Sequence, residues 1–190
     1  MKPMNYSRTI VLTVLCLFAG TAYAHPGHPP TGFAGGFAHP FLGVDHLFAM
    51  IAVGLWAVQQ GGRALWAVPA AFVGAMGMGG LLAWTGVALP HVETAIALSV
   101  LLLGLLIATQ QRASVIAGMG IAGVFALFHG YAHGMEMPQA TSPVLYALGF
   151  VLATACLHGV GIAGGLLGRR AMRMAGIGIA ATGTALLVLV

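Results

Sequence analysis

Long apolar runs alternate with short polar breaks along most of the chain. Breaks at arginine, glutamine and proline leave runs of about 17 to 25 residues, the length that an α-helix needs to cross a bilayer. We therefore predict an all-α, polytopic membrane protein with six transmembrane helices, over residues 40–59, 64–87, 92–109, 115–133, 143–166 and 172–190. Glycine-rich runs at 74–80 and 159–165 predict close packing between helices.

The N-terminal segment has the features of a cleaved secretory signal. Lys2 and Arg8 precede an apolar core over residues 9–19, and Ala22-Tyr23-Ala24 supplies small residues at the expected cleavage position. The chain then divides into a signal peptide (1–24), a periplasmic N-terminal arm (25–38) and a six-helix transmembrane domain (39–190). Cys156 is the one cysteine of the mature chain, which excludes an intramolecular disulfide.

The few charges indicate an orientation in the membrane. Hydrophobic residues make up 59% of the chain and charged residues 5%, so the basic excess marks the orientation of the loops rather than nucleic-acid binding. Arg63, Arg112 and the cluster Arg169, Arg170 and Arg173 follow the first, third and fifth predicted spans. By the positive-inside rule these loops are cytoplasmic, so we expect a multi-pass protein of the bacterial inner membrane with both mature termini in the periplasm.

Metal-competent side chains stand inside these apolar runs. An ionisable group at membrane depth is costly unless it faces a partner, a cavity or an ion, so Asp45 beside His46 indicates function. The alternative is a buried polar pair that only fixes the packing of helices. His39 lies seven positions before His46, about 10.5 Å along a straight helix, which is too far for one ion. Either the two histidines act in succession, or a break at Gly43 brings them together.

A second group of candidates closes the fourth span. His129 and His133 have the i, i+4 spacing that lets two imidazoles bind one ion. Glu136 shares their face if the helix continues past Gly134. A solvated pair at the membrane surface is the structural alternative.

Five further residues are weaker candidates for metal binding. His25 and His28 lie in a Pro- and Gly-rich arm that is either a metal-capture segment or a solvated tail. His91 and Glu93 open the third span, where an acid also favours a helix N-terminus. His158, about fifteen residues into the fifth span, is either a ligand on an exit route or a packed histidine bonded to a backbone carbonyl.

The types of ligand limit the choice of metal ion. Imidazole with carboxylate suits divalent nickel, cobalt, zinc or copper, whereas Cu(I) and iron–sulfur clusters call for more sulfur. Met135 and Met137 flank Glu136 and keep a softer ion open as an alternative. The residues indicate no prosthetic group, and the chain lacks the glycine-rich ATP-binding motif that a pump would carry.

Two motifs resemble those of the HupE/UreJ family of nickel and cobalt permeases. The first is HPxxGxDH, which starts at His39, and the second is FHGxAHGxE, which starts at Phe128. The resemblance implies a small metal permease linked to hydrogenase, urease or cobalamin metabolism. The positions that match the family's motifs are His39, Asp45, His46, His129, His133 and Glu136.

We therefore expect transport of Ni²⁺, or next of Co²⁺, from the periplasm across the inner membrane, with Cu²⁺ and Zn²⁺ as chemical alternatives. The partners expected are the lipid bilayer, the metal ion, and a periplasmic metal donor or metalloenzyme maturation proteins. Two other functions fit the same residues: a membrane metal sensor or accessory protein, and a membrane metalloenzyme or haem protein. The sequence leaves the oligomeric state open.

Overall fold

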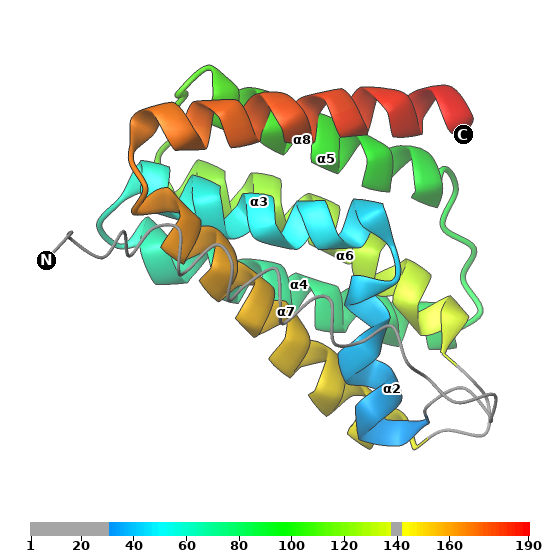
Figure 1. Ribbon diagram of the computed structural model, residues 1–190. Coiled ribbons are helices and arrows are strands. Elements are labelled where there is room, and N and C mark those ends of the chain that lie inside the picture. Colours follow the sequence, from blue (N-terminus) through cyan, green and yellow to red (C-terminus); the bar gives the residue numbers. More distant parts are fainter. Residues whose placement is uncertain (1–30, 138–141) are drawn as a thin grey trace, which may run out of the picture.

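The computed structural model describes residues 31–137 and 142–190, and these residues form helices joined by short links, without a β-strand (Figure 1). The predicted signal peptide and the candidates His25 and His28 lie outside the described residues. The elements in chain order are α2 (Gly32–Ala38), the 3₁₀ turn η1 (His39–Phe41), α3 (Val44–Gln60), α4 (Ala64–Trp84), α5 (Val92–Ala108), α6 (Val115–Glu136), α7 (Pro143–Gly165) and α8 (Arg169–Leu189).

Four of these helices, α4, α6, α7 and α8, are long and apolar enough to cross a membrane. The bent pair of Gly32–Phe41 and Val44–Gln60 would supply a fifth crossing, while α5, with 17 residues, is a shorter apolar helix. The described residues thus form a membrane-type helical protein. The six spans of the sequence analysis remain a prediction.

The first predicted span, 40–59, is not one continuous helix. The helical segment Gly32–Phe41 meets Val44–Gln60 at 81°, and α3 begins only at Val44. Pro40 lies in the 3₁₀ turn, and Gly43 precedes α3 with an extended backbone at φ −101° and ψ 123°. Because a proline lacks a backbone N–H and Gly43 leaves the helical conformation, the helical hydrogen bonds do not run through this segment. Residues 32–38, in the predicted N-terminal arm, instead form α2, which packs on α7.

Close approach of α4 and α6 depends on glycine. A Cβ on Gly130 would overlap the backbone carbonyl of Met76, and a Cβ on Gly79 would overlap that of Leu127. Small residues let helix backbones meet in this way where lipid offers no hydrophobic drive. The predicted packing role therefore holds for Gly79, and also for Gly161 at the crossing of α7 with α3, whereas Gly74, Gly77 and Gly159 face open space.

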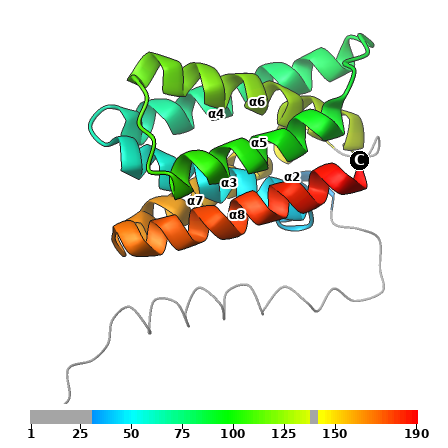
Figure 2. The same cartoon turned by 90° about the horizontal axis from the view of Figure 1, so that it is seen from above.

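The remaining helices pack as a second pair, α5 with α8, which lie side by side in both ribbon views (Figure 2). Trp56 and Phe72 are among the largest fully buried side chains of the core. At one end of the bundle, Gln59 donates hydrogen bonds to the backbone carbonyls of Leu106 and Gln111, which ties α3 to the link after α5. This bundle places the N-terminal part of α3 against the C-terminal part of α6.

Candidate metal centre

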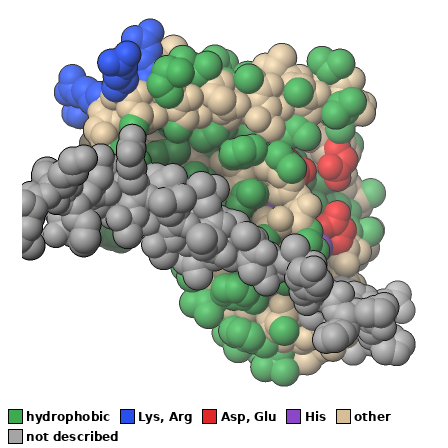
Figure 3. All heavy atoms as spheres, in the orientation of Figure 1, with side chains coloured by type: hydrophobic (Ala, Val, Ile, Leu, Met, Phe, Trp, Pro, Cys, Tyr) green, Lys and Arg blue, Asp and Glu red, His purple; other side chains and the backbone are tan. Residues whose placement is uncertain are grey.

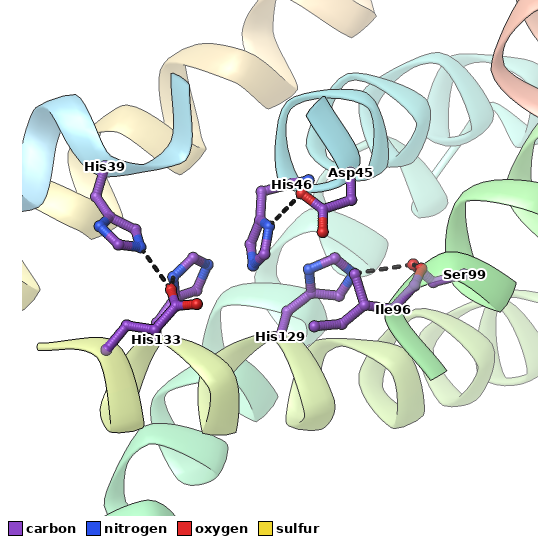
Figure 4. Close-up of polar contacts among 8 residues, drawn as sticks. His39, Asp45, His46, Ile96, Ser99, His129 and His133 are labelled. Carbon is purple, nitrogen blue, oxygen red and sulfur yellow. Dashed lines mark hydrogen bonds and ion pairs between the residues drawn. The ribbon is translucent and has the colours of Figure 1, made fainter. Parts of the chain in front are cut away.

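Four histidines from three elements form a continuous row of imidazole rings (Figure 4). His39 comes from η1, His46 from α3, and His129 and His133 from α6. Neighbouring ring centroids are 4.8 Å apart for His39 and His133, 4.1 Å for His133 and His46, and 5.0 Å for His46 and His129. The two motifs that are separate in the sequence thus meet in one site.

The outer end of the row combines two imidazoles with a carboxylate. His39 Nε2 donates a hydrogen bond of 3.0 Å to Glu136 Oε2, and the same oxygen lies 3.9 Å from His133 Nδ1. One ligand atom from each of these three residues lies within 4.8 Å of the others. Two nitrogen ligands and one oxygen ligand at this spacing suit a divalent transition-metal ion.

Exposure is highest at the outer end of the row and lowest at its inner end. The side chain of Glu136 is 51% exposed and that of His39 is 23% exposed, whereas His133 is 6% exposed. His129, at the inner end, is fully buried. The row therefore leads from the surface of the protein into its core.

The carboxylate of Asp45 holds the ring of His46 by a hydrogen bond. Its Oδ1 accepts a 2.7 Å hydrogen bond from the ring nitrogen Nδ1 of His46 and a 2.8 Å bond from the His46 backbone N–H. A carboxylate only accepts hydrogen bonds, so Nδ1 of His46 carries a proton and Nε2 of the neutral ring keeps a lone pair. That Nε2 is buried and has no hydrogen-bond partner within residues 31–137 and 142–190. Metal-binding histidines have this arrangement, in which a carboxylate holds the far nitrogen and orients the ring.

Gly43 provides the space for this contact. A Cβ at this position would lie 2.7 Å from Asp45 Oδ1 and 3.0 Å from His46 Nδ1. Any side chain here would displace the carboxylate or the imidazole, since both separations are shorter than ordinary van der Waals contact. The glycine therefore serves the geometry of the Asp45–His46 pair as well as the helix break.

The helix break at Gly43 determines how the rings of His39 and His46 lie relative to each other. With the chain bent at Gly43, the two rings contact the same third ring, that of His133, from different elements. α6 continues past Gly134 to Glu136, so the predicted face of His129, His133 and Glu136 is present. Along that face His129 and His133 both contact His46, whose ring lies between them in Figure 4.

The inner end of the row has a partner that the sequence analysis missed. Ser99 of α5 is fully buried, and its Oγ lies 2.8 Å from Nε2 of His129. A single serine in an apolar helix ordinarily bonds to a backbone carbonyl of its own helix, so its sequence position carried no signal of this contact.

The other candidates occupy different positions. His158 is buried on α7 with Nε2 unpartnered, and its ring contacts Phe72, which also contacts His129. His91 and Glu93 are exposed at the start of α5, and among the described residues no hydrogen bond or ion pair joins them to the row. The structure thus assembles six of the predicted residues in one place and sets His158 beyond Phe72.

These observations define an all-helical, membrane-type protein with imidazole and carboxylate groups gathered between its helices. The family model described as HupE / UreJ protein matches residues 13–186. Protein HupE of Rhizobium leguminosarum bv. viciae is 44% identical over an alignment that covers 97% of this chain and all of the relative. No solved structure matches. The chain belongs to the HupE/UreJ family, a transporter-type family associated with nickel and cobalt.

Proposed function

We propose that this protein carries Ni²⁺, and next Co²⁺, from the periplasm across the bacterial inner membrane, and that the row of histidines is its metal route. The proposal includes six transmembrane helices, a cleaved signal peptide and periplasmic mature termini. Membership of the HupE/UreJ family supports transport, and the ligand set supports a divalent ion of intermediate softness.

The observation that carries this proposal is a series of buried imidazole nitrogens without partners. Nε2 of His46, Nδ1 of His129 and both ring nitrogens of His133 are buried, and none has a hydrogen-bond partner among the described residues. Leaving such a group unpaired costs about 1–3 kcal/mol, so histidines that served packing alone would be expected to bond to carbonyls or hydroxyls. A bound cation would satisfy the lone pair that each neutral ring has on one of its two nitrogens.

The spacing of the row supports stepwise movement of the ion. Glu136 and His39 are partly exposed, so an entering ion would exchange its water ligands for these side chains. The ring of His133 contacts those of both His39 and His46 and so links the entrance to the inner part of the row. Consecutive rings in contact let an incoming ligand bind before the outgoing one is released. His158, beyond Phe72, is the next buried imidazole toward the other end of the bundle.

The charge distribution supports entry from the periplasm. Arg112, Arg169, Arg170 and Arg173 line one cavity of about 800 Å³ where α5 meets α6 and α7 meets α8. Figure 3 shows basic side chains at one end of the molecule and acidic side chains at the opposite end. With the arginines in the cytoplasm, as the positive-inside rule expects, the end with Glu136 faces the periplasm.

Uptake of labelled nickel and cobalt into proteoliposomes tests the proposal. We expect the wild-type protein to take up nickel and the His46→Ala variant to lose most of that uptake, because the central ring of the row is gone. Thr109→Ala is the control. Thr109 follows the C-terminal end of α5, away from the histidine row, and this variant should transport normally.

Two outcomes would contradict the proposal. Stoichiometric metal binding by intact protein without uptake would identify a sensor or accessory protein. A haem absorbance band in the purified protein, or turnover of a substrate at a bound metal, would identify a metalloenzyme or haem protein.

A further inference from the structure

Among the described residues, Ser99 is the one residue of α5 whose side chain forms a hydrogen bond with a ring of the histidine row. Its Oγ makes two short contacts, 2.6 Å to the backbone carbonyl of Ile96 and 2.8 Å to Nε2 of His129. Both Ser99 and His129 are fully buried, so water does not compete for these contacts. The inference below rests on the proposed metal route.

The two contacts determine where the protons lie. A serine hydroxyl has one proton to donate, and two oxygen atoms at 2.6 Å repel each other unless that proton lies between them. The hydroxyl proton therefore points to the Ile96 carbonyl, and the Ser99 oxygen accepts a hydrogen bond from His129. The ring must then carry its proton on Nε2, which leaves the lone pair on Nδ1.

We infer that Ser99 is a positioning residue that fixes His129 in the tautomer whose Nδ1 is free to bind the metal. Nδ1 of His129 is buried and has no hydrogen-bond partner in the part of the chain that the structure describes, and the ring contacts that of His46. Figure 4 shows His129 between His46 on one side and Ser99 on the other. Asp45 does the same for His46, so two supporting residues present two ligand nitrogens, Nε2 of His46 and Nδ1 of His129.

Other helix hydroxyls show that this arrangement is more than ordinary back-bonding. Thr109, Thr182 and Thr184 each donate to a carbonyl four residues earlier, and none of them contacts a histidine within the described part of the chain. Ser99 donates in a similar way but also accepts from a ring. The additional contact is the one that selects a tautomer, and metal ligation commonly depends on such support from outside the ligand set.

Nitrogen NMR of metal-free protein labelled with ¹⁵N-histidine tests the tautomer directly. The signals of His129, assigned by their loss in His129→Gln, should show a protonated Nε2 and an unprotonated Nδ1. In Ser99→Ala this preference should weaken or reverse, while the matched control Thr184→Val should leave it unchanged. A proton on Nδ1 in the wild type, or an unchanged spectrum in Ser99→Ala, would overturn the inference.

Nickel titration of the same variants tests the consequence for binding. Ser99→Ala should weaken nickel binding by roughly 10- to 100-fold, the usual effect of losing such a supporting group. Ser99→Thr, which keeps the hydroxyl, should restore both the tautomer and most of the affinity. Wild-type affinity in Ser99→Ala would contradict the positioning role.

The two tests separate this inference from the proposed function. The metal-free spectrum needs neither binding nor uptake. If the tautomer is as described and the wild-type protein neither binds nor transports nickel, the metal route is wrong while the tautomer assignment stands. If nickel is transported but the tautomer is the other one, only the role of Ser99 is wrong.

Discussion

At the scale of single residues, three of the four histidines in the row have a hydrogen-bond partner on one ring nitrogen, whereas His133 has none among the described residues. His46 is held by a carboxylate and His129 by a hydroxyl, whereas His39 bonds directly to Glu136. The two inner rings are therefore fixed in place before an ion arrives. The outer ring, His39, bonds to the carboxylate of Glu136, which also lies where the ion would enter.

Replacing Asp45 with asparagine tests the supporting carboxylate. The amide keeps the size of the side chain but removes its charge and allows an NH₂ group to face Nδ1 of His46, so the ring loses its fixed tautomer. We expect nickel affinity and uptake to fall by roughly 10- to 100-fold with normal protein levels in the membrane. Titration calorimetry and vesicle uptake measure the two effects, and retained uptake would argue against a central role for Asp45.

Gly43→Ala tests the space around the same pair. The added methyl group would lie 2.7 Å from Asp45 Oδ1, and since the contact is with a side chain, the carboxylate can move away without unfolding the protein. We expect a folded protein with a melting temperature close to that of the wild type and nickel uptake reduced by roughly 10-fold or more. A variant with wild-type uptake would show that the Asp45–His46 hydrogen bond is dispensable.

The site could be predicted in part from sequence at this scale. Ionisable side chains in apolar runs stand out, so His39, Asp45, His46, His129 and His133 were identified, and the structure brings them together. Their division into ion-facing rings and supporting groups depends on contacts between helices, which no spacing along one chain reveals. Ser99 was missed because one hydroxyl in a helix has an adequate partner in its own backbone.

At the scale of helices, hydrophobic pattern located most elements but not the bend in the first. Apart from Asp45, the apolar run continues across Gly43 without a charged residue, so its composition alone predicts one span. The local backbone chemistry of Pro40 and Gly43 interrupts it, and the resulting 81° bend turns His39 toward α6. Conversely, α6 continues through Gly134, where a helix end was the alternative, because packing against α4 stabilises its last turn.

The crossing of α4 and α6 can be tested with two glycines of the same helix. Gly130→Ala would push a methyl group into the backbone of Met76 and separate the helices, whereas Gly120→Ala points into open space. We expect Gly130→Ala to lower stability by about 1–3 kcal/mol or to abolish folding. Gly120→Ala should leave stability unchanged or raise it slightly, because alanine favours helix over glycine. Thermal unfolding in detergent measures both, and equal melting temperatures would contradict the close approach.

At the scale of the whole molecule, one end of the protein is basic, and the opposite end has acidic residues and histidine. Arginines gather where α5 meets α6 and α7 meets α8, while Glu136 and His39 lie at the opposite end. Their order along the chain was sufficient to predict this separation, since arginine follows alternate spans. The pairing of α4 with α6 and of α5 with α8 was not predictable, because apolar helices with weak sidedness do not specify neighbours by composition.

Single cysteines at two matched threonines test the orientation of the molecule. Thr85 and Thr109 each follow the end of a helix and donate a hydroxyl hydrogen bond to a backbone carbonyl, so both substitutions remove a contact of this kind. The Thr85 hydroxyl also accepts a 3.4 Å hydrogen bond from the backbone N–H of Val87. Thr85 begins the link between α4 and α5. In that link the backbone carbonyl of Val87 accepts a hydrogen bond from Tyr131 of α6, near the histidine row. Thr109 begins the link between α5 and α6, which contains Arg112.

In a Cys156→Ser background we expect a membrane-impermeant maleimide to label Thr85→Cys in right-side-out vesicles and Thr109→Cys in inside-out vesicles. The reason is that the arginine-bearing links stay in the cytoplasm, which fixes the histidine end outside. The reverse pattern would place Glu136 and His39 in the cytoplasm and make the same row of ligands an exit for metal. Labelling of both cysteines from one side would mean that α5 does not cross the membrane, which its length of 17 residues makes the critical point of the six-span topology.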